Sequence, residues 1–432
     1  MRHVYRLLMF ITLVGGSAAA WLLPVVGDAS PVVDSTPTPA NLRHQAIAFY
    51  ERRLTEDPHS ALDMTQLAAL FMEDGRMRGD ERAFVSAESL ARRSLEERTR
   101  RNGKSAALLV NTLLAQHRFV EAKQVAEELV SAEPEQPAYR ALLSETMMEV
   151  GDYRGSVSML GTLRENRADL GIAPRFARWA ELTGRPGEAR RILRSAIDEA
   201  RRRPDLTGEQ RAWFSLRLAD VELRHGHLRA AAKAIEDGLR ESPGDWRLIL
   251  ARARLQAAKG QWKDAVRSSE EVIAAVPSPE AFALLAESNE RLGRKEEAAG
   301  FTKALEGIAR AKPGQMHRAW AMALLDDVNR STEVAPLAAA DTLVRRDVYS
   351  LDLLAWALHR AGRTIEALPL SRRAMTLGSV EPALRYRAGI IEFAAGDSTS
   401  GRRHLELAFR GKGALSSSQV AEARKTLKSA GR

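Results

Sequence analysis

Two adjacent segments near the C-terminus have the same length and the same pattern, and this repetition limits the possible folds more than any other feature. They are VYSLDLLAWALHRAGRTIEALPLSRRAMTLGSVE (348–381) and PALRYRAGIIEFAAGDSTSGRRHLELAFRGKGAL (382–415), which align without a gap. A fixed period of this size, ~34 residues, is typical of arrays that stack one small unit many times. We therefore expect a solenoid rather than a set of globular domains.

Each segment contains two helical patterns separated by a turn. The first apolar-periodic run ends at Ala361-Gly362 in one segment and at Ala395-Gly396 in the other. A second amphipathic run follows within two or three residues and carries a small or apolar side chain every three to four positions. This spacing is the period of an α-helix, and a glycine after the run permits the left-handed turn that ends it. The predicted unit is helix, tight turn, helix.

The same frame recurs along most of the chain. The frame has turn glycines such as Gly226 and Gly260, small residues such as Ala122 and Ala265, and Pro277 at equivalent positions. The pattern resembles the tetratricopeptide repeat family. That resemblance implies an all-α fold, a right-handed superhelical solenoid of about ten helix-turn-helix repeats. Besides the two segments above, copies begin near Ala61, Gly103, Pro137, Leu170, Ala212, Trp246, Pro279 and Met316.

The first 29 residues are predicted to be a targeting segment. Arg2 and Arg6 precede an uncharged, mostly apolar run from Leu7 to Val26. This order is typical of a secretory signal peptide, and about 20 apolar residues can also cross a bilayer. A cleaved signal peptide and an uncleaved membrane anchor both remain open. Either would place the array in the periplasm or on the outer face of the cytoplasmic membrane. A buried N-terminal helix is the third alternative.

The remaining boundaries follow from composition. Residues 30–40 are rich in Pro, Ser and Thr and are expected to form a spacer. The array is expected over 41–415, and 416–432 is predicted to be a capping helix with Ser417 as its N-cap. An insertion, MEDGRMRGDERAF, is expected to lengthen the turn in the first full repeat. A polar loop at 200–210 is interpreted as a bend in the solenoid or a binding loop.

Motifs for catalysis are missing from the sequence. The absence of cysteine excludes disulfides, thiolate metal sites and a cysteine nucleophile. There is no Walker loop, GxGxxG, GxSxG or HExxH motif. The nearest approach to a metal site is His225-Gly226-His227 with Glu222, although turn residues at a solvent edge explain it more simply. We expect no enzyme activity, no cofactor and no metal.

The chain is basic, with 65 Lys and Arg against 56 Asp and Glu. Arginine runs at 98–101 and 201–203 fall at predicted helix C-termini, where cations offset the helix dipole. A nucleic-acid interface would need them on one face with interleaved aromatics. We therefore expect no nucleic-acid partner. Acidic proteins, anionic envelope polymers or anionic lipids are better counterparts for an exported chain.

The resemblance also implies where a partner binds, on the concave groove lined by the first helix of each repeat. A basic middle and an aromatic C-terminal end are expected there. Core packing is the alternative for the aromatic residues, and local pairs with Asp220 and Glu222 are the alternative for the arginines. The predicted groove residues are Arg178, Arg217, Arg224, Arg247, Arg254, Trp320, Trp356, His359, Tyr386, Ile390 and Phe393.

Together these observations predict a non-enzymatic interaction scaffold of the bacterial cell envelope that binds an extended peptide or the edge of a partner protein. Helix-pair solenoids present long concave surfaces that suit such partners. A second hypothesis is the handling or export of an envelope polysaccharide or cell-wall polymer, because aromatic rings stack on sugars and arginines attract anionic groups.

Overall fold

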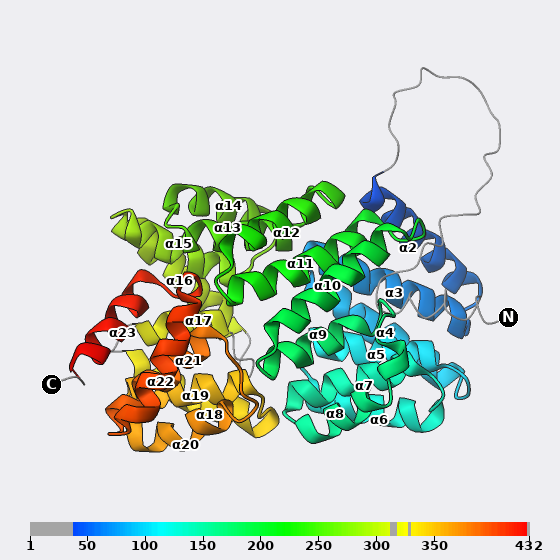
Figure 1. Cartoon of the computed structure of the whole chain (residues 1–432). Helices are drawn as coiled ribbons and strands as arrows, with labels where there is room; N and C mark the ends of the chain where they lie inside the picture. Colours follow the sequence, from blue (N-terminus) through cyan, green and yellow to red (C-terminus); the bar gives the residue numbers. More distant parts are fainter. Residues whose placement is uncertain (1–37, 312–317, 327–329, 430–432) are drawn as a thin grey trace.

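A computed structural model describes residues 38–311, 318–326 and 330–429, and Figure 1 shows that these form an array of helices. In its N-terminal half the helices are α2 (Pro39–Glu56), α3 (Ala61–Arg78), α4 (Glu81–Glu97), α5 (Gly103–Ala115), α6 (Phe119–Ala132), α7 (Pro137–Val150), α8 (Tyr153–Gly161), α9 (Ala173–Leu182), α10 (Pro186–Arg201), α11 (Gly208–Arg224) and α12 (Leu228–Glu241).

The second half continues the same alternation. Its helices are α13 (Trp246–Ala258), α14 (Trp262–Ala275), α15 (Pro279–Arg291), α16 (Lys295–Ala311), α17 (Arg318–Asp326), α18 (Ser331–Val344), α19 (Val348–Arg360), α20 (Thr364–Ala374), α21 (Pro382–Ala394), α22 (Ser398–Arg410) and α23 (Ser417–Ser429). Short 3-10 turns lie at Arg164–Asn166 and Lys412–Ala414.

The predicted fold class is confirmed. Helices α3 to α22 form ten consecutive antiparallel pairs, preceded by the single helix α2 and followed by α23. The small residues expected where two helices cross are fully buried, as at Ala122, Ala231, Ala265 and Ala367. Helices can approach closely only where such side chains lie between them, so these alanines set the packing of each pair.

Three local predictions need correction. The insertion in the first repeat lengthens α3 rather than a turn, because the helix continues to Arg78 and ends at Gly79 with φ of 59°. The first helix begins at Pro39 and is capped by Thr38, whose hydroxyl accepts from the amide of Asn41 at 3.2 Å. The last helix is capped by Ser416, one residue earlier than expected, through the amide of Gln419 at 3.2 Å.

The predicted targeting segment lies outside the described residues. Among the helices that the structure describes, none combines the length and the apolar character needed to cross a bilayer.

The array coils so tightly that one superhelical turn rests on the next. The amide of Val348 donates to the Tyr153 hydroxyl at 2.7 Å, and the Trp246 indole donates to the carbonyl of Arg76 at 3.1 Å. Arg43 pairs with Glu209 at 3.1 Å. These partners are 195, 170 and 166 residues apart, a separation of five or six repeats. In Figure 1 helix α19 accordingly lies beside helix α8, and the green helix α11 lies near the blue helix α2.

Turn glycines make this contact possible. Gly151, Gly184 and Gly226 all have positive φ, and a Cβ on each would lie 2.4 to 2.6 Å from a backbone carbonyl oxygen of the next superhelical turn. Gly260, in the same place in its own repeat, has φ of 72° and meets nothing within 4 Å. The first three glycines therefore meet two requirements, a left-handed conformation and direct backbone contact between turns.

Comparing two of these glycines tests the contact. Gly184→Ala and Gly260→Ala both carry the left-handed conformational cost of ~1 kcal/mol. Only Gly184→Ala also places a methyl group 2.4 Å from the Gly378 carbonyl oxygen. We expect it to lower the free energy of unfolding by ~1–3 kcal/mol more than Gly260→Ala, as overpacking does. Urea unfolding followed by circular dichroism measures both; equal losses would show that the turns do not touch in solution.

Candidate functional site

The five arginines predicted to form a basic groove are half-buried and ion-paired. Arg217 and Arg254 share Asp220. This supports the alternative that the arginines form local pairs rather than a free basic surface. The pairs are Arg178–Glu149 at 2.7 Å, Arg217–Asp220 at 3.4 Å, Arg224–Glu181 at 2.8 Å, Arg247–Asp245 at 2.6 Å and Arg254–Asp220 at 3.0 Å.

These pairs belong to a network along the inside of the superhelix. Arg224 donates to both carboxylate oxygens of Glu181 at 2.8 Å. Burial alone would raise the pKa of Glu181, but Arg224 holds that pKa well below its usual range. On the facing repeats, Tyr349 donates to Glu381 at 3.0 Å, and burial followed by the charge of Glu381 raises the pKa of Tyr349 well above its ordinary value. The concave surface of the middle repeats is thus occupied by its own charges.

The aromatic residues predicted to face the groove are mostly in the core, which corrects that prediction. Trp320, Trp356 and Tyr386 are 8%, 5% and 1% exposed, and together with Ile390 they belong to one hydrophobic cluster of the C-terminal repeats. The Phe393 side chain packs against the same cluster from a partly buried position. The cluster joins side chains of consecutive repeats from Leu305 to Ala423, and these side chains cover the rings.

His359 is also drawn into this cluster. Its ring lies 5.3 Å from the Trp356 ring, and its Nδ1 is 3.0 Å from the Thr364 hydroxyl. Burial, followed by the nearby charge of Arg360, lowers the pKa of His359 below that of a free imidazole. It is therefore a neutral packing residue at pH 7.

Trp320, Trp356 and Tyr386 nevertheless line one cavity of about 1010 Å³. The cavity is bounded by α15, α16, α17, α19, α21 and α23. Small side chains make the space, because the walls contributed by α15, α16 and α17 carry alanines at Ala283, Ala286, Ala298, Ala299 and Ala323. The structure thus brings three of the predicted residues to a common cavity while exposing little of each ring.

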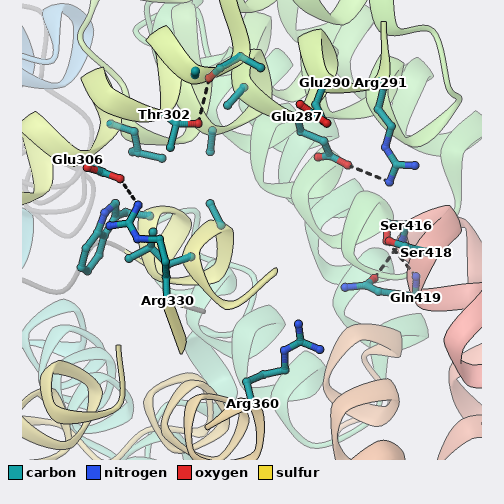
Figure 2. Close-up of a pocket in the computed structure, with 18 of the residues that line it drawn as sticks. Glu287, Glu290, Arg291, Thr302, Glu306, Arg330, Arg360, Ser416, Ser418 and Gln419 are labelled. Atoms are coloured by element: carbon teal, nitrogen blue, oxygen red, sulfur yellow. Dashed lines mark hydrogen bonds and ion pairs between the residues drawn. The ribbon is translucent and has the colours of Figure 1, made fainter. Parts of the chain in front are cut away.

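Charged and polar groups surround the opening of this cavity, as Figure 2 shows. Arg330 pairs with Glu306, and Arg291 pairs with Glu287 at 3.8 Å. Arg360 extends toward the open centre; its Nε donates to the carbonyl of Leu325 at 2.8 Å, and its guanidinium lies 5.8 Å from the centre of the Trp356 ring. Lys295 and Lys303 also line the cavity. The side chains therefore offer a polar rim around an apolar floor.

Helix α23 closes one side of the cavity. The Tyr386 hydroxyl donates to Glu422, and burial, followed by that carboxylate, raises the pKa of Tyr386 above its ordinary value. Arg291 on α15 donates to the Ser417 hydroxyl at 3.2 Å, across 126 residues of sequence. The predicted capping helix thus also forms a wall of the candidate site.

Sequence reasoning missed the contribution of α16, the second helix of its repeat. The resemblance directed attention to first helices only, so Lys303 and Arg330 were not considered. One signal was available: α15 and α16 are rich in alanine, with Ala283 and Ala286 on the first and Ala298 and Ala299 on the second. Such small side chains leave space opposite the face that carries them.

No metal site can be built from the residues described. Across the described ranges, no group of three or more His, Asp or Glu is placed to hold an ion. His225 and His227 are instead engaged with carboxylates, His225 with Glu181 at 3.4 Å and His227 with Glu222 at 2.9 Å.

The class of protein follows from ten consecutive helix pairs, in which glycines form turns and alanines lie where two helices cross. The chain is a tetratricopeptide-like repeat protein. No family model and no curated protein matches its sequence.

Solved structures of other helical repeat proteins are similar to this tetratricopeptide-like array. The human IFIT1 dimer with PPP-AAAA is 13% identical, with a TM-score of 0.46 over 86% of this chain and 87% of its own. PilW, a type IV pilus biogenesis factor, is 15% identical, with a TM-score of 0.40 over 49% of this chain and 96% of its own. A tetratricopeptide repeat protein from Parabacteroides merdae is 16% identical, with a TM-score of 0.34 over 57% and 92%. At these values the likeness carries no argument about function.

The burial of Trp356 leads to a test. Because Trp356 is only 5% exposed within the cluster, Trp356→Ala should leave a cavity and lower the free energy of unfolding by ~3–5 kcal/mol. A groove-facing tryptophan would cost a fraction of that amount. Thermal and urea unfolding of the variant measure the loss, and the exposed Phe49→Ala is the control, for which we expect only a small change. Similar values for both variants would restore the groove assignment.

Proposed function

We propose that this protein is a non-enzymatic interaction scaffold that holds a segment of a partner protein in the C-terminal cavity. One observation carries the proposal: the ion-pair network fills the concave surface of the middle repeats, whereas the last repeats enclose about 1010 Å³ of open space. A volume of this size is at the upper end of the range for ligand sites and suits several residues of an extended chain.

The composition of the cavity favours a peptide over a polysaccharide. Sugars stack on the exposed faces of aromatic rings, but Trp320, Trp356 and Tyr386 are only 8%, 5% and 1% exposed. A peptide instead needs small apolar contacts for its side chains and polar groups for its backbone. The alanine walls offer the first, and Thr302, Ser416, Ser418 and Gln419 offer the second.

Photo-crosslinking in cells tests this site with a matched pair of positions on α16. Ala299 lines the cavity, whereas the neighbouring Gly300 is exposed and does not line it. A photoreactive phenylalanine analogue at 299 should give a discrete protein adduct that is absent or at least several-fold weaker at 300. Ala299→Trp, which places a large ring in the cavity, should weaken co-purification of the same protein several-fold while leaving the helical signal unchanged. Equal adducts at both positions would reject the cavity as the binding site.

We further propose that the array works outside the cytoplasm. The support is the sequence of residues 1–29, in which two arginines precede an apolar run of export-signal type. Alkaline phosphatase fused after Arg432 should be active in a bacterial host, because that enzyme matures only after export, and deletion of residues 1–29 should abolish its activity. A bright cytoplasmic fluorescent-protein fusion together with inactive phosphatase would contradict the proposal.

A further inference from the structure

The outer face of α18 is apolar and uncovered. Leu337, Leu343 and Val344 are 45%, 77% and 55% exposed, and Pro336, Ala339 and Ala340 on the same side are exposed as well. The opposite face of the helix is buried in the C-terminal cluster through Val334, Ala335 and Ala338. Contiguous exposed apolar side chains are unusual on a surface that contacts only water, so this stripe indicates an interface.

The stripe has the pattern of a surface that packs against itself. Ala340 lies midway between Leu337 and Leu343, and also midway between Pro336 and Val344. Two copies of α18 crossing antiparallel at Ala340 would place Pro336 and Leu337 of each against Leu343 and Val344 of the other. The alanines at the centre permit the close approach that helix packing requires. Isologous contacts of this kind are the commonest route to a homodimer.

The ends of the stripe carry opposite charges. Glu333 lies exposed in the first turn, and Arg346 follows the last turn, where its Nε lies 3.4 Å from the carbonyl of Thr342. Within the described residues Arg346 has no ion pair. An antiparallel crossing brings Glu333 of each copy toward Arg346 of the other, whereas a parallel one brings like charges together. The opposed helix dipoles favour the same orientation.

An anionic membrane is a poorer match for this face. Membrane surfaces attract clusters of uncompensated cations around exposed apolar residues. At the ends of α18, Arg330 is paired with Glu306 and Glu333, and Arg345 is paired with Asp347 at 2.6 Å. The charges near α18 are therefore largely balanced.

We propose that α18 forms a two-fold, antiparallel interface between two copies of this chain, centred on Ala340. The interface is independent of the function proposed above. One helix pair buries less than the ~800 Å² per partner of a standard interface, so the dimer is expected to be weak, with a Kd in the micromolar range or above. Because α17 and α19 on either side of α18 contribute Trp320 and Trp356 to the cavity, a dimer would present two cavities together.

The lack of cysteine in the sequence permits a direct test on the full chain. Ala340→Cys places one thiol next to its symmetry mate, and Val120→Cys, exposed to 56% on α6, is the control. Mild oxidation should give a disulfide-linked dimer at least ten-fold faster for Ala340→Cys. In the otherwise wild-type chain, Leu343→Glu should weaken dimer formation at least ten-fold, as measured by sedimentation velocity. It should not lower Tm, since Leu343 is mostly exposed. In the Ala340→Cys background, Leu343→Glu should also suppress cross-linking.

Charge exchange tests the orientation. Glu333→Arg and Arg346→Glu should each weaken the dimer several-fold, and the double variant should restore it. A double variant weaker than either single variant would overturn the antiparallel arrangement. Cross-linking of Ala340→Cys no faster than the control, with unchanged sedimentation of Leu343→Glu, would overturn the interface. A monomeric wild-type chain that binds anionic phosphatidylglycerol vesicles through Leu343 would instead assign the stripe to a membrane.

Discussion

The contact between consecutive superhelical turns controls the rest of this structure. Backbone groups of one turn meet those of the next at Gly151, Gly184 and Gly226, and hydrogen bonds such as that from Val348 to Tyr153 hold them there. Within one turn, charged side chains of the middle repeats pair with those of the neighbouring repeat, as in Arg224–Glu181 and Arg254–Asp220. Among the described residues, the last repeats line a cavity of about 1010 Å³, and the first repeats line one of about 690 Å³.

The ion pairs inside the superhelix are better understood as specifying geometry than as adding stability. A desolvated pair such as Arg224 and Glu181 recovers in Coulomb energy about what it loses in hydration, yet removing one partner leaves a costly buried charge. Pairs such as Arg224–Glu181 and Arg254–Asp220 join neighbouring repeats. They therefore help to fix how one repeat sits on the next.

The local architecture could be predicted from the sequence, and the long-range arrangement could not. Glycine turns and alanine crossings act within a single repeat, so their spacing revealed ten helix pairs. The contacts between turns join residues 166 to 195 apart, and nothing local distinguishes Gly184 from Gly260. The groove assignment of Trp356 was wrong because side chains of the adjoining repeats, such as Tyr386, bury its ring, and the spacing within one repeat does not show this. The export segment and the partner remain predictions.

The touching turns also change how such a protein can fold and evolve. In an open array each repeat contacts only its neighbours, so repeats can be gained or lost singly and folding can spread from any point. Here one extra repeat between Tyr153 and Val348 would shift every contact between turns out of register. The chain must also close loops that span five or six repeats before those contacts form, which slows folding. Repeat number is thus constrained in this protein as strand number is in a closed barrel.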